Sequence, residues 1–323
     1  MNPKSNHKNK LKIVVLAGGI SHERDISLKS ARRVADALVE EGAEVVMREP
    51  DHELLANLKK DNPDVIWPVL HGASGEDGAL RDILALTGIP FVGASSGSAK
   101  LSWDKAVAKI LVARSGIQTP NSITLPRETF KELDAESVLK LVTKSMSLPL
   151  VVKPARSGSA QGVTIVKKQD QLNRAMIDAY VYCDVAIIED FVSGTEIAVG
   201  VIDLGSGPVA LPAVEIEARS GHFGFEERYI AGETDYFVPA RLSKSVAEKV
   251  AKVAIDAHKT LGLRHLSRVD MIIDPKGVPW FLEANVLPGL TETSLLPQAI
   301  IASGHTLGDV YYLLAQAAFS GKG

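Results

Sequence analysis

The segment from Leu266 to Asn285 reads LSRVDMIIDPKGVPWFLEAN and carries the strongest structural signal in this chain of 323 residues. A turn signal, Asp274 to Gly277, separates two strand-like runs, so we predict a β-hairpin with strands at 266–273 and 279–284. Side chains alternate between the two faces of a strand, so one face of the hairpin is apolar and packs, while the other is polar. The polar face gathers Arg268, Asp270, Glu283 and Asn285.

This polar face has the chemistry of a site for Mg²⁺ and phosphate. Hard oxygen donors beside an arginine are what Mg²⁺ bound to substrate phosphates requires. The alternative is an ordinary solvated face of an edge hairpin, which would be enough to explain a lone Asp/Glu pair. Asn285 and the Pro288-Gly289 turn favour the binding site, because a turn rich in exposed backbone amides can approach an anion.

The first hundred residues alternate apolar strands with helical patterns. Strands are expected at 12–16, 45–46, 65–70 and 91–92. An amphipathic helix is expected at 26–41, where Gly42 stops it. This alternation predicts parallel βαβ units, whose ligands bind beyond the carboxyl ends of the strands. The loops that leave those ends, 17–24 and 71–77, are rich in glycine and polar residues.

The rest of the chain reads as two further segments. Asp104 is expected to cap a helix at 105–115, and a later helix is expected to start at Ser245, with Glu248 at capping-box spacing. The other expected elements are antiparallel strands at 150–153 and 163–166, a helix at 169–182, strands at 185–189 and 196–202, and two C-terminal helices.

The loop from Pro154 to Gly162 is a second candidate for phosphate binding. It follows a strand that ends in Lys153, and its small residues let backbone N–H groups approach an anion. The loop lacks the Gly-Lys-Ser/Thr ending of a P-loop, which excludes that class of nucleotide site.

Composition excludes several classes of protein. Apolar residues make up 46% of the chain and charged residues 23%, which excludes a disordered chain or a collagen-like one. The net charge of −3 gives no basic footprint for nucleic acid or an anionic membrane, and no segment has the character of a membrane span. The single cysteine, Cys183, cannot form an internal disulfide, which fits a reducing compartment. We therefore expect a cytoplasmic protein with no nucleic-acid or membrane partner.

One motif favours a different class of enzyme. The segment Gly93-Ala94-Ser95-Ser96-Gly97 matches the G-x-S-x-G nucleophile elbow and follows a strand. A serine hydrolase would use Ser95 with a later aspartate and one of four histidines: His222, His258, His265 or His305. Glycine and serine are common in turns, so a chance match is the favoured interpretation.

Seven motifs together resemble the D-alanine–D-alanine ligases of the ATP-grasp superfamily, over nearly the whole chain. In chain order they are AGGISHERDIS (17–27), LHGASGEDG (70–78), WDK (103–105), VKP (152–154), EERY (226–229), RVD (268–270) and LEANVLPGLTETS (282–294). The resemblance implies an α/β, ATP-grasp fold: an N-terminal Rossmann-like parallel-sheet domain (1–104), a central ATP-grasp subdomain (105–194) and a C-terminal one (195–323). It also implies ATP-dependent joining of two D-alanines through a D-alanyl phosphate for peptidoglycan precursor synthesis, in a homodimer.

The resemblance implies roles for individual residues. For ATP these are the phosphate lysines Lys105 and Lys153, the adenine hinge Glu189, Asp190, Phe191 and Val192, and the ribose carboxylate Glu196. For two Mg²⁺ ions, which Mn²⁺ can replace, they are Asp270, Asn285 and the bridging Glu283. For the substrates they are His71, Glu23 at the first ammonium, Arg268 and the Gly289 amide as oxyanion stabilisers, and Ser294 with Leu295 at the second carboxylate. Tyr229 resembles a member of a hydrogen-bonded set with Glu23 and Ser159.

The chain departs from the family pattern in the phosphate loop. Ser157 stands where the family carries a glutamate, and Ala160 and Gln161 interrupt a serine pair. These changes bear on nucleotide affinity and loop closure, and they leave the metal triad intact. Within the superfamily, the alternatives are a ligase that makes another dipeptide or a D-alanyl ester, and a catalytically weak nucleotide-binding relative.

Overall fold

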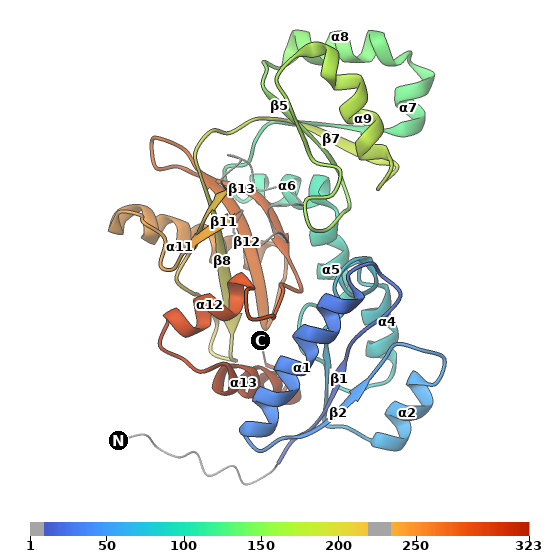
Figure 1. Cartoon of the computed structure of the whole chain (residues 1–323), viewed down its shortest axis with the longest axis vertical. Helices are drawn as coiled ribbons and strands as arrows, with labels where there is room; N and C mark the ends of the chain where they lie inside the picture. The colour runs from blue at the N-terminus through green and yellow to red at the C-terminus, as the bar shows by residue number, and fades with distance from the viewer. Residues whose placement is uncertain (1–9, 219–233, 323) are drawn as a thin grey trace.

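The computed structural model describes residues 10–218 and 234–322, which form three sheets with their helices (Figure 1). In the view of Figure 1, the sheet that is second in the sequence lies at the top, the first lies at the lower right, and the third lies at the centre left. Tyr229 and the other residues of the EERY motif, and His222, lie outside the described residues.

The first sheet is parallel, as predicted, with the strand order β2-β1-β3. Its strands are β1 (Lys12–Leu16), β2 (Glu44–Arg48) and β3 (Val65–Pro68), and Ile66 forms a further parallel bridge with Phe91. Its helices are α1 (Arg24–Glu40), α2 (Leu54–Asp61), α3 (Ala73–Glu76) and α4 (Ala79–Leu86). The loops after β1 and β3 leave the carboxyl edge of this sheet, where a ligand is expected.

The middle sheet is antiparallel, in the order β4-β7-β5-β6. Its strands are β4 (Ser122–Pro126), β5 (Leu150–Pro154), β6 (Thr164–Val166) and β7 (Val185–Asp190). The helices α7 (Arg127–Glu132), α8 (Ala135–Ser145) and α9 (Leu172–Tyr180) pack on it around a separate hydrophobic core. The helix expected at 169–182 is therefore shorter, because a 3₁₀ turn (Gln169–Gln171) precedes α9.

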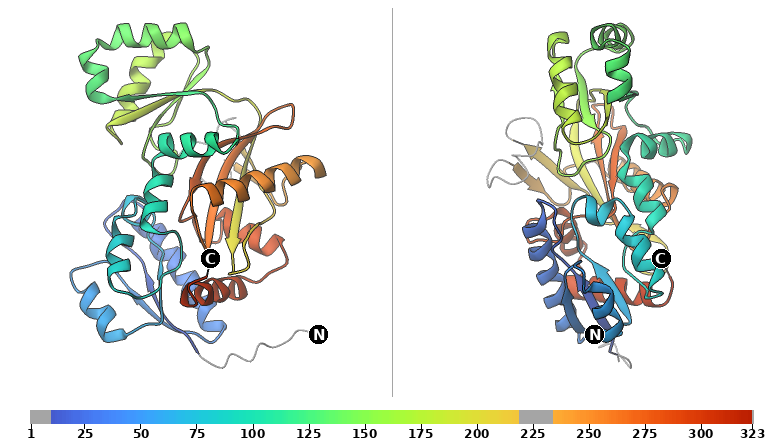
Figure 2. Two further views of the ribbon diagram at one scale, coloured as in Figure 1. Left: turned by 180° about the vertical axis from the view of Figure 1, so that it is seen from behind. Right: turned by 90° about the vertical axis from the view of Figure 1, so that its right-hand side faces the viewer.

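The third sheet has the order β11-β10-β8-β12-β13, with β9 also paired to β8. Its strands are β8 (Thr195–Asp203), β9 (Pro208–Ala210), β10 (Val214–Ala218), β11 (Thr234–Phe237), β12 (Leu266–Ile273) and β13 (Pro279–Asn285). One face packs against α5 (Ser96–Trp103), α6 (Lys105–Arg114) and α11 (Lys244–Thr260), and α11 is seen from that side in Figure 2, left. The other face packs against α12 (Leu295–Ala302) in a core that α13 (Leu307–Phe319) shares with the first sheet.

Both faces of β8 are buried, which explains its continuous apolar run. Ile197, Val199 and Val201 belong to the core on the α11 side, and Ala198 and Ile202 to the core on the α12 side. The second of these cores reaches the first sheet, where the rings of Trp67 and Tyr311 meet edge to face with centroids 5.4 Å apart. The first and third sheets are thus joined by a shared apolar interior.

Two predicted helix caps have different outcomes. Asp104 caps α6, because its Oδ1 accepts hydrogen bonds from the amides of Ala106 (3.1 Å) and Val107 (3.2 Å). The capping box expected at Ser245 is wrong: α11 starts at Lys244, and Ser243 is the cap that accepts from the amide of Val246. Two serines lie two residues apart here, and only the one with extended backbone can cap the helix.

The predicted hairpin is formed by β12 and β13, with Asp270 opposite Glu283 and Arg268 opposite Asn285. An irregularity follows, since Met271 pairs with Phe281 and Leu282 is the extra residue. The strict alternation expected along the second strand is therefore wrong at Leu282, which lines a cavity beside Glu283 instead of packing with Ala284. A β-bulge of this kind redirects a side chain next to a site.

Within the described ranges, no helix combines the length and the apolar character needed to cross a bilayer.

Candidate active site

Two cavities meet where the three sheets approach one another. The larger, of about 590 Å³, lies among the loops of the first sheet, the Pro154–Gly162 loop, the end of the β12–β13 hairpin and the start of α12. The smaller, of about 140 Å³, lies between the middle and third sheets. Lys105, Ser157 and Glu283 line both cavities, so a molecule that extends from one into the other must pass these three residues.

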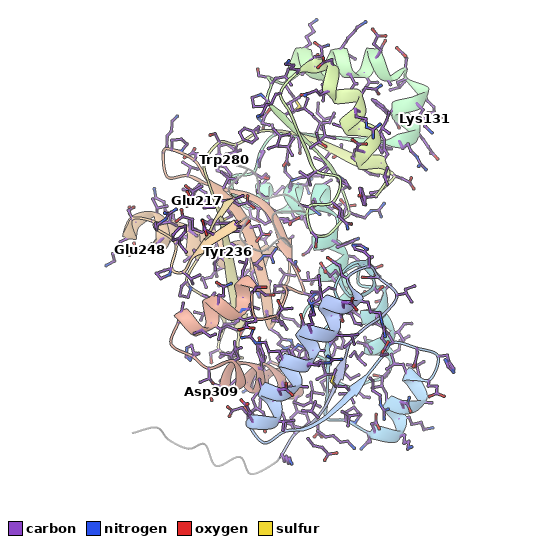
Figure 3. The ribbon with its side chains drawn as sticks, in the orientation of Figure 1. Lys131, Glu217, Tyr236, Glu248, Trp280 and Asp309 are labelled. Atoms are coloured by element: carbon purple, nitrogen blue, oxygen red, sulfur yellow. The ribbon has the colours of Figure 1, made fainter. Side chains whose placement is uncertain are left out.

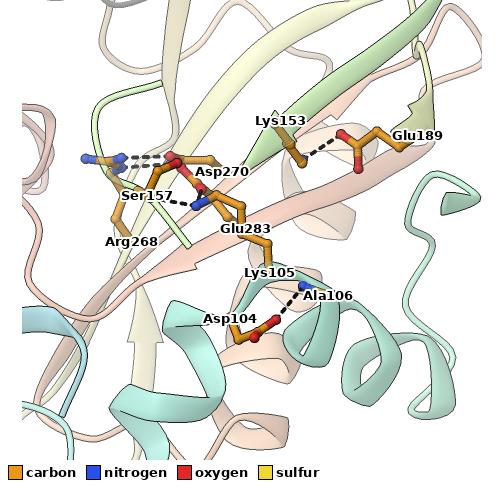
Figure 4. Close-up of polar contacts among 9 residues, drawn as sticks. All are labelled: Asp104, Lys105, Ala106, Lys153, Ser157, Glu189, Arg268, Asp270 and Glu283. Carbon is orange, nitrogen blue, oxygen red and sulfur yellow. Dashed lines mark hydrogen bonds and ion pairs between the residues drawn. The ribbon is translucent and has the colours of Figure 1, made fainter. Parts of the chain in front are cut away.

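The hairpin brings Arg268 and Asp270 into a buried, two-bond ion pair. Nε and Nη2 of Arg268 each donate to an oxygen of Asp270 at 2.7 Å (Figure 4). Burial lowers the pKa of the Arg268 guanidinium, but the charge and hydrogen bonds of Asp270 outweigh burial and leave that pKa raised. Arg268 is therefore a fixed cation at the edge of the larger cavity.

Glu283 and Asn285 lie on the same polar face. Oε2 of Glu283 is 3.2 Å from Nζ of Lys105, and that Nζ also donates to the carbonyl of Ser157 at 2.7 Å. Oδ1 of Asn285 accepts from the amide of Leu287 at 2.8 Å.

The donor set at this place fits a hard cation. Asp270, Glu283 and Asn285 offer carboxylate and carboxamide oxygens, which suit Mg²⁺ or Mn²⁺. In the part of the chain that the structure describes, no group of three or more His, Cys, Asp or Glu side chains gathers as a metal site. The set on the hairpin differs because its third member is an amide.

Glu23, just before α1, and Ser159, in the loop after β5, lie far apart in the sequence and meet at the larger cavity. The Ser159 hydroxyl donates to Oε1 of Glu23, across 136 residues of sequence. Gly72 lies against the other oxygen, where an added Cβ would be 2.9 Å from Oε2 of Glu23 and the φ of +81° favours glycine. Two members of the set that the sequence predicted are thus in contact, and the third, Tyr229, lies outside the described residues.

His71 connects α1 to the turn that carries Gly289. Its Nε2 is 3.0 Å from the Ser30 hydroxyl, and the amide of Leu290 donates to the same hydroxyl at 3.3 Å. Burial lowers the pKa of His71, so the imidazole is neutral at pH 7. His71 lines the larger cavity, and through the Ser30 hydroxyl it is also connected to the turn.

The remaining predicted substrate residues gather at the start of α12. Gly289, Ser294 and Leu295 line the larger cavity. A Cβ on Gly289 would lie 2.7 Å from the Ser294 hydroxyl, so a larger residue here would displace that hydroxyl. The Ser294 hydroxyl bonds Thr291 and does not cap α12, which leaves the amides of that helix start open to an anionic group. Tyr236 of β11 (Figure 3) lines the same cavity.

The smaller cavity contains the residues assigned to ATP. Lys153, Glu189, Asp190, Phe191, Val192 and Glu196 all line it, together with Ala160 of the loop. Nζ of Lys153 is 2.6 Å from Oε1 of Glu189 (Figure 4). Burial raises the pKa of the Glu189 carboxyl, but Lys153 and Lys109 outweigh burial and leave it lowered, so Glu189 is an anion.

Sequence reasoning missed two buried groups of the site. Lys109 bonds the second oxygen of Glu189, and its position one helical turn after Lys105 was an available signal. Glu76 lies in the LHGASGEDG motif, whose pattern predicted no role for it. Its Oε1 accepts from the amide of Gly72 at 2.9 Å, and burial raises the pKa of the carboxyl to about 8.

The altered phosphate loop makes a contact of its own with the first sheet. Nε2 of Gln161 lies 2.7 Å from Nε2 of His22. The backbone amide of Lys105 donates to the carbonyl of Ala155 at 2.9 Å, so α6 holds the other end of the loop. Where the family carries a serine pair, Gln161 thus contributes a contact with the loop that follows β1.

Ser95 has a structural role. Its hydroxyl accepts from the amide of Ser98 at 3.2 Å and caps α5. His265 instead bonds the amide of Gly93, and His258 bonds Ser267. Among the residues that the structure describes, no hydrogen bond joins Ser95 to a histidine, so the elbow motif lacks the geometry of a nucleophile.

Comparison with known proteins identifies the family. A family model for the D-ala D-ala ligase C-terminus matches residues 111–315. The D-alanine–D-alanine ligase of Bordetella petrii is 36% identical over 308 residues, which cover 95% of this chain and 92% of that protein. The chain belongs to the D-alanine–D-alanine ligase family.

Other relatives and solved structures match over a similar length. The ligase of Pelotomaculum thermopropionicum is 34% identical, with 97% of this chain and 98% of that protein covered. The VanG D-Ala:D-Ser ligase from Enterococcus faecalis superposes with a TM-score of 0.83 at 28% identity, covering 96% and 100% of the two chains. The D-alanine–D-alanine ligase from Bacillus anthracis complexed with ATP gives 0.79 at 27% identity, covering 96% and 98%. The predicted α/β ATP-grasp fold is confirmed.

Proposed function

We propose that this protein is an ATP-dependent D-alanine–D-alanine ligase that forms the dipeptide through a D-alanyl phosphate and releases ADP and phosphate. One observation carries the proposal: the smaller cavity, lined by the residues proposed to bind ATP, shares Lys105, Ser157 and Glu283 with the larger cavity. A nucleotide in the smaller cavity would direct its terminal phosphate toward an amino acid in the larger one. This geometry suits phosphoryl transfer, in which positioning and charge stabilisation do most of the work.

The chain's own residues supply the cations for the phosphates. Lys153 from β5 and Lys105 from α6 reach the nucleotide path from two sides, and both are buried. The hinge from Glu189 to Val192 would hold the adenine, and Glu196 the ribose. Asp270, Glu283 and Asn285 would hold Mg²⁺, which neutralises the charge of the transferring phosphate when it is bound.

The larger cavity would bind the two amino acids in order. Glu23, held by Ser159, would accept the ammonium of the first D-alanine, with neutral His71 beside it. Arg268 and the amide of Gly289 would stabilise the oxyanion of the tetrahedral intermediate. The Ser294 hydroxyl and the amide of Leu295, at the start of α12, would hold the carboxylate of the second D-alanine.

The reaction balances with these groups. The carboxylate oxygen of the first D-alanine attacks the γ-phosphorus, and the bond to the β-phosphate oxygen breaks to release ADP. The amine of the second D-alanine, after losing a proton, attacks the acyl carbon, and phosphate leaves with the carboxylate oxygen. Tyr229, proposed to act with Glu23 and Ser159, would shape the space where that amine loses its proton.

The proposal also covers the location, the assembly and the domains of the enzyme. The enzyme would act in the cytoplasm as a homodimer in peptidoglycan precursor synthesis. We retain domain boundaries after residues 104 and 194. The second substrate is the least constrained feature, since one structural neighbour is a D-Ala:D-Ser ligase.

A competition assay tests the activity and the second substrate together. The protein is supplied with ATP, Mg²⁺ and D-alanine, with D-serine, D-lactate or L-alanine added as rival acceptors, and the products are resolved by mass. We expect D-alanyl-D-alanine as the main product. A dominant D-alanyl-D-serine or D-alanyl-D-lactate product would show that the protein is a D-alanine–D-serine or D-alanine–D-lactate ligase instead. ADP release that does not depend on D-alanine would contradict the proposal.

A further inference from the structure

A single buried carboxylate lies between two buried lysines beside the smaller cavity. The ammonium of Lys109 contacts one oxygen of Glu189, and Nζ of Lys153 is 2.6 Å from the other. The side chains of Lys109, Glu189 and Lys153 are 3%, 4% and 8% exposed, so water screens these charges poorly. They come from three elements: α6, β7 and β5.

The charges of this cluster do not cancel. Two lysines and one glutamate leave a surplus of one positive charge in a buried place, and such a surplus is costly without an anionic partner. Lys153 and Glu189 line the smaller cavity, whereas Lys109 lies behind Glu189 and does not line it. The surplus charge is therefore presented to the cavity by Lys153.

Each oxygen of the Glu189 carboxylate contacts a different lysine, and this leaves the ammonium of Lys153 only partly engaged by Glu189. With Lys109 in place, Lys153 contacts only one oxygen of the carboxylate, and its other N–H groups can be directed into the cavity. Without Lys109, both oxygens of Glu189 would be available to Lys153 and the two would form a neutral pair. A neutral pair has no net attraction for phosphate.

We propose that Lys109 is a positioning residue for nucleotide binding: it occupies one oxygen of Glu189 and thereby leaves the charge of Lys153 available to the phosphates of ATP. The inference rests on the proposed function, because it takes the smaller cavity as the ATP site. Lys109 itself touches no substrate. It acts through Glu189.

A double-mutant cycle separates this role from simple loss of packing. We compare Lys109→Met in the natural background and in a Glu189→Gln background, and measure the Kd of a non-hydrolysable ATP analogue. In the natural background we expect Lys109→Met to weaken binding about tenfold, within the range of coupling between charges in contact. In the Glu189→Gln background we expect a change of less than about twofold, because no carboxylate remains to capture Lys153. An equal loss in both backgrounds would overturn the proposal.

Steady-state kinetics provide a second readout. Lys109→Met should raise KM for ATP with little change in kcat or in KM for D-alanine, and Lys109→Arg should restore KM for ATP because it keeps the charge. A fall in kcat alone, or failure of Lys109→Arg to restore KM, would contradict the positioning role. If Lys109→Met does not fold, the comparison of Glu189→Gln with the double variant still decides, since both lack the buried carboxylate. Equal nucleotide affinities are expected for that pair, and a tenfold difference would overturn the proposal.

The same measurements distinguish failure of the inference from failure of the proposed function. Lys153→Met is expected to lose affinity for the ATP analogue by more than Lys109→Met does. If the natural protein does not bind the analogue, or Lys153→Met binds it equally well, the assignment of the smaller cavity to ATP is wrong. If these two controls behave as expected but the cycle is additive, only the role of Lys109 is wrong.

Discussion

Nζ of Lys105 lies 3.2 Å from Oε2 of Glu283, and both residues line the two cavities of the site. The pair connects α6, which Asp104 caps, to β13 of the hairpin. Glu283 lies next to the bulge in that strand. Glu283 therefore borders both the cavity proposed for the nucleotide and the cavity proposed for the amino acids.

Replacing Glu283 tests the proposed metal site. Glu283→Gln keeps the size of the side chain but removes the charge that a bridging metal ligand needs, so we expect Mg²⁺-dependent ligation to fall by about a hundredfold or more, the scale of losing a transition-state electrostatic contact. Thermal unfolding should change little, because Glu283 is only partly buried. Glu248→Gln, on the exposed face of α11 (Figure 3), is the matched control. Near-normal ligation by Glu283→Gln in Mg²⁺ would show that the metal assignment is wrong.

Replacing Ser95 tests the serine-hydrolase alternative. Ser95→Ala removes the cap of α5, so we expect a loss of about 1 kcal/mol in the free energy of unfolding and no more than a small change in ligation. Thr306→Ala, which removes the cap of α13, should behave in the same way. A fall in activity of about a hundredfold, the scale of a general acid–base group, would restore Ser95 as a candidate nucleophile.

Replacing Glu76 tests the buried carboxyl that the sequence motif did not explain. Its pKa is about 8 in the folded protein, against 4.5 for an ordinary glutamate, so the folded state holds a proton that the unfolded chain releases between these values. By linkage, the free energy of unfolding should fall as pH rises through that window, by up to about 1.4 kcal/mol per pH unit. Glu76→Gln cannot titrate but keeps an acceptor for the Gly72 amide, so its stability should depend less on pH.

The measurement for Glu76 is chemical denaturation at intervals between pH 5 and pH 8.5, on the natural protein and the variant. All other titrating groups are common to both proteins, so the difference between the two curves isolates Glu76. Parallel curves would mean that Glu76 has an ordinary pKa in the folded state.

Replacing His22 and Gln161 tests whether their contact holds the altered phosphate loop in place. Nε2 of each residue lies 2.7 Å from the other, and the contact connects the loop to the first sheet. Single replacements, His22→Ala and Gln161→Ala, should each raise KM for ATP a few-fold, the effect of about 1 kcal/mol for one hydrogen bond. The double replacement should be no worse than either single one, because the two residues act through one contact. Additive effects in KM would show that each acts alone.

Local sequence patterns predicted the parts of the fold that depend only on neighbouring residues. The alternation in LSRVDMII and the Asp274–Gly277 turn were enough for the hairpin, and Asp104 was enough for the start of α6. The bulge at Leu282 was not predictable, because it depends on pairing with a strand whose register the sequence does not reveal. Ser243 and Ser245 both carry a capping side chain, and the backbone of the preceding turn decides between them.

The site was predictable where a motif concentrates chemistry and not where folding brings distant residues together. Arg268, Asp270, Glu283 and Asn285 share one hairpin and were found from their spacing. The partner of Lys109 is 80 residues away, so its burial against Glu189 became visible only in three dimensions. The unusual pKa of Glu76 comes from desolvation, which no local pattern reports.

The central claim, ligation through a D-alanyl phosphate, is tested most directly by following an oxygen atom. D-alanine labelled with ¹⁸O in its carboxylate is supplied with ATP and Mg²⁺, and the released phosphate and dipeptide are analysed by mass. Attack of the carboxylate on the γ-phosphorus followed by loss of phosphate moves one carboxylate oxygen to phosphate. We therefore predict one ¹⁸O atom in phosphate for each D-alanyl-D-alanine formed. Unlabelled phosphate accompanying dipeptide formation would contradict the account.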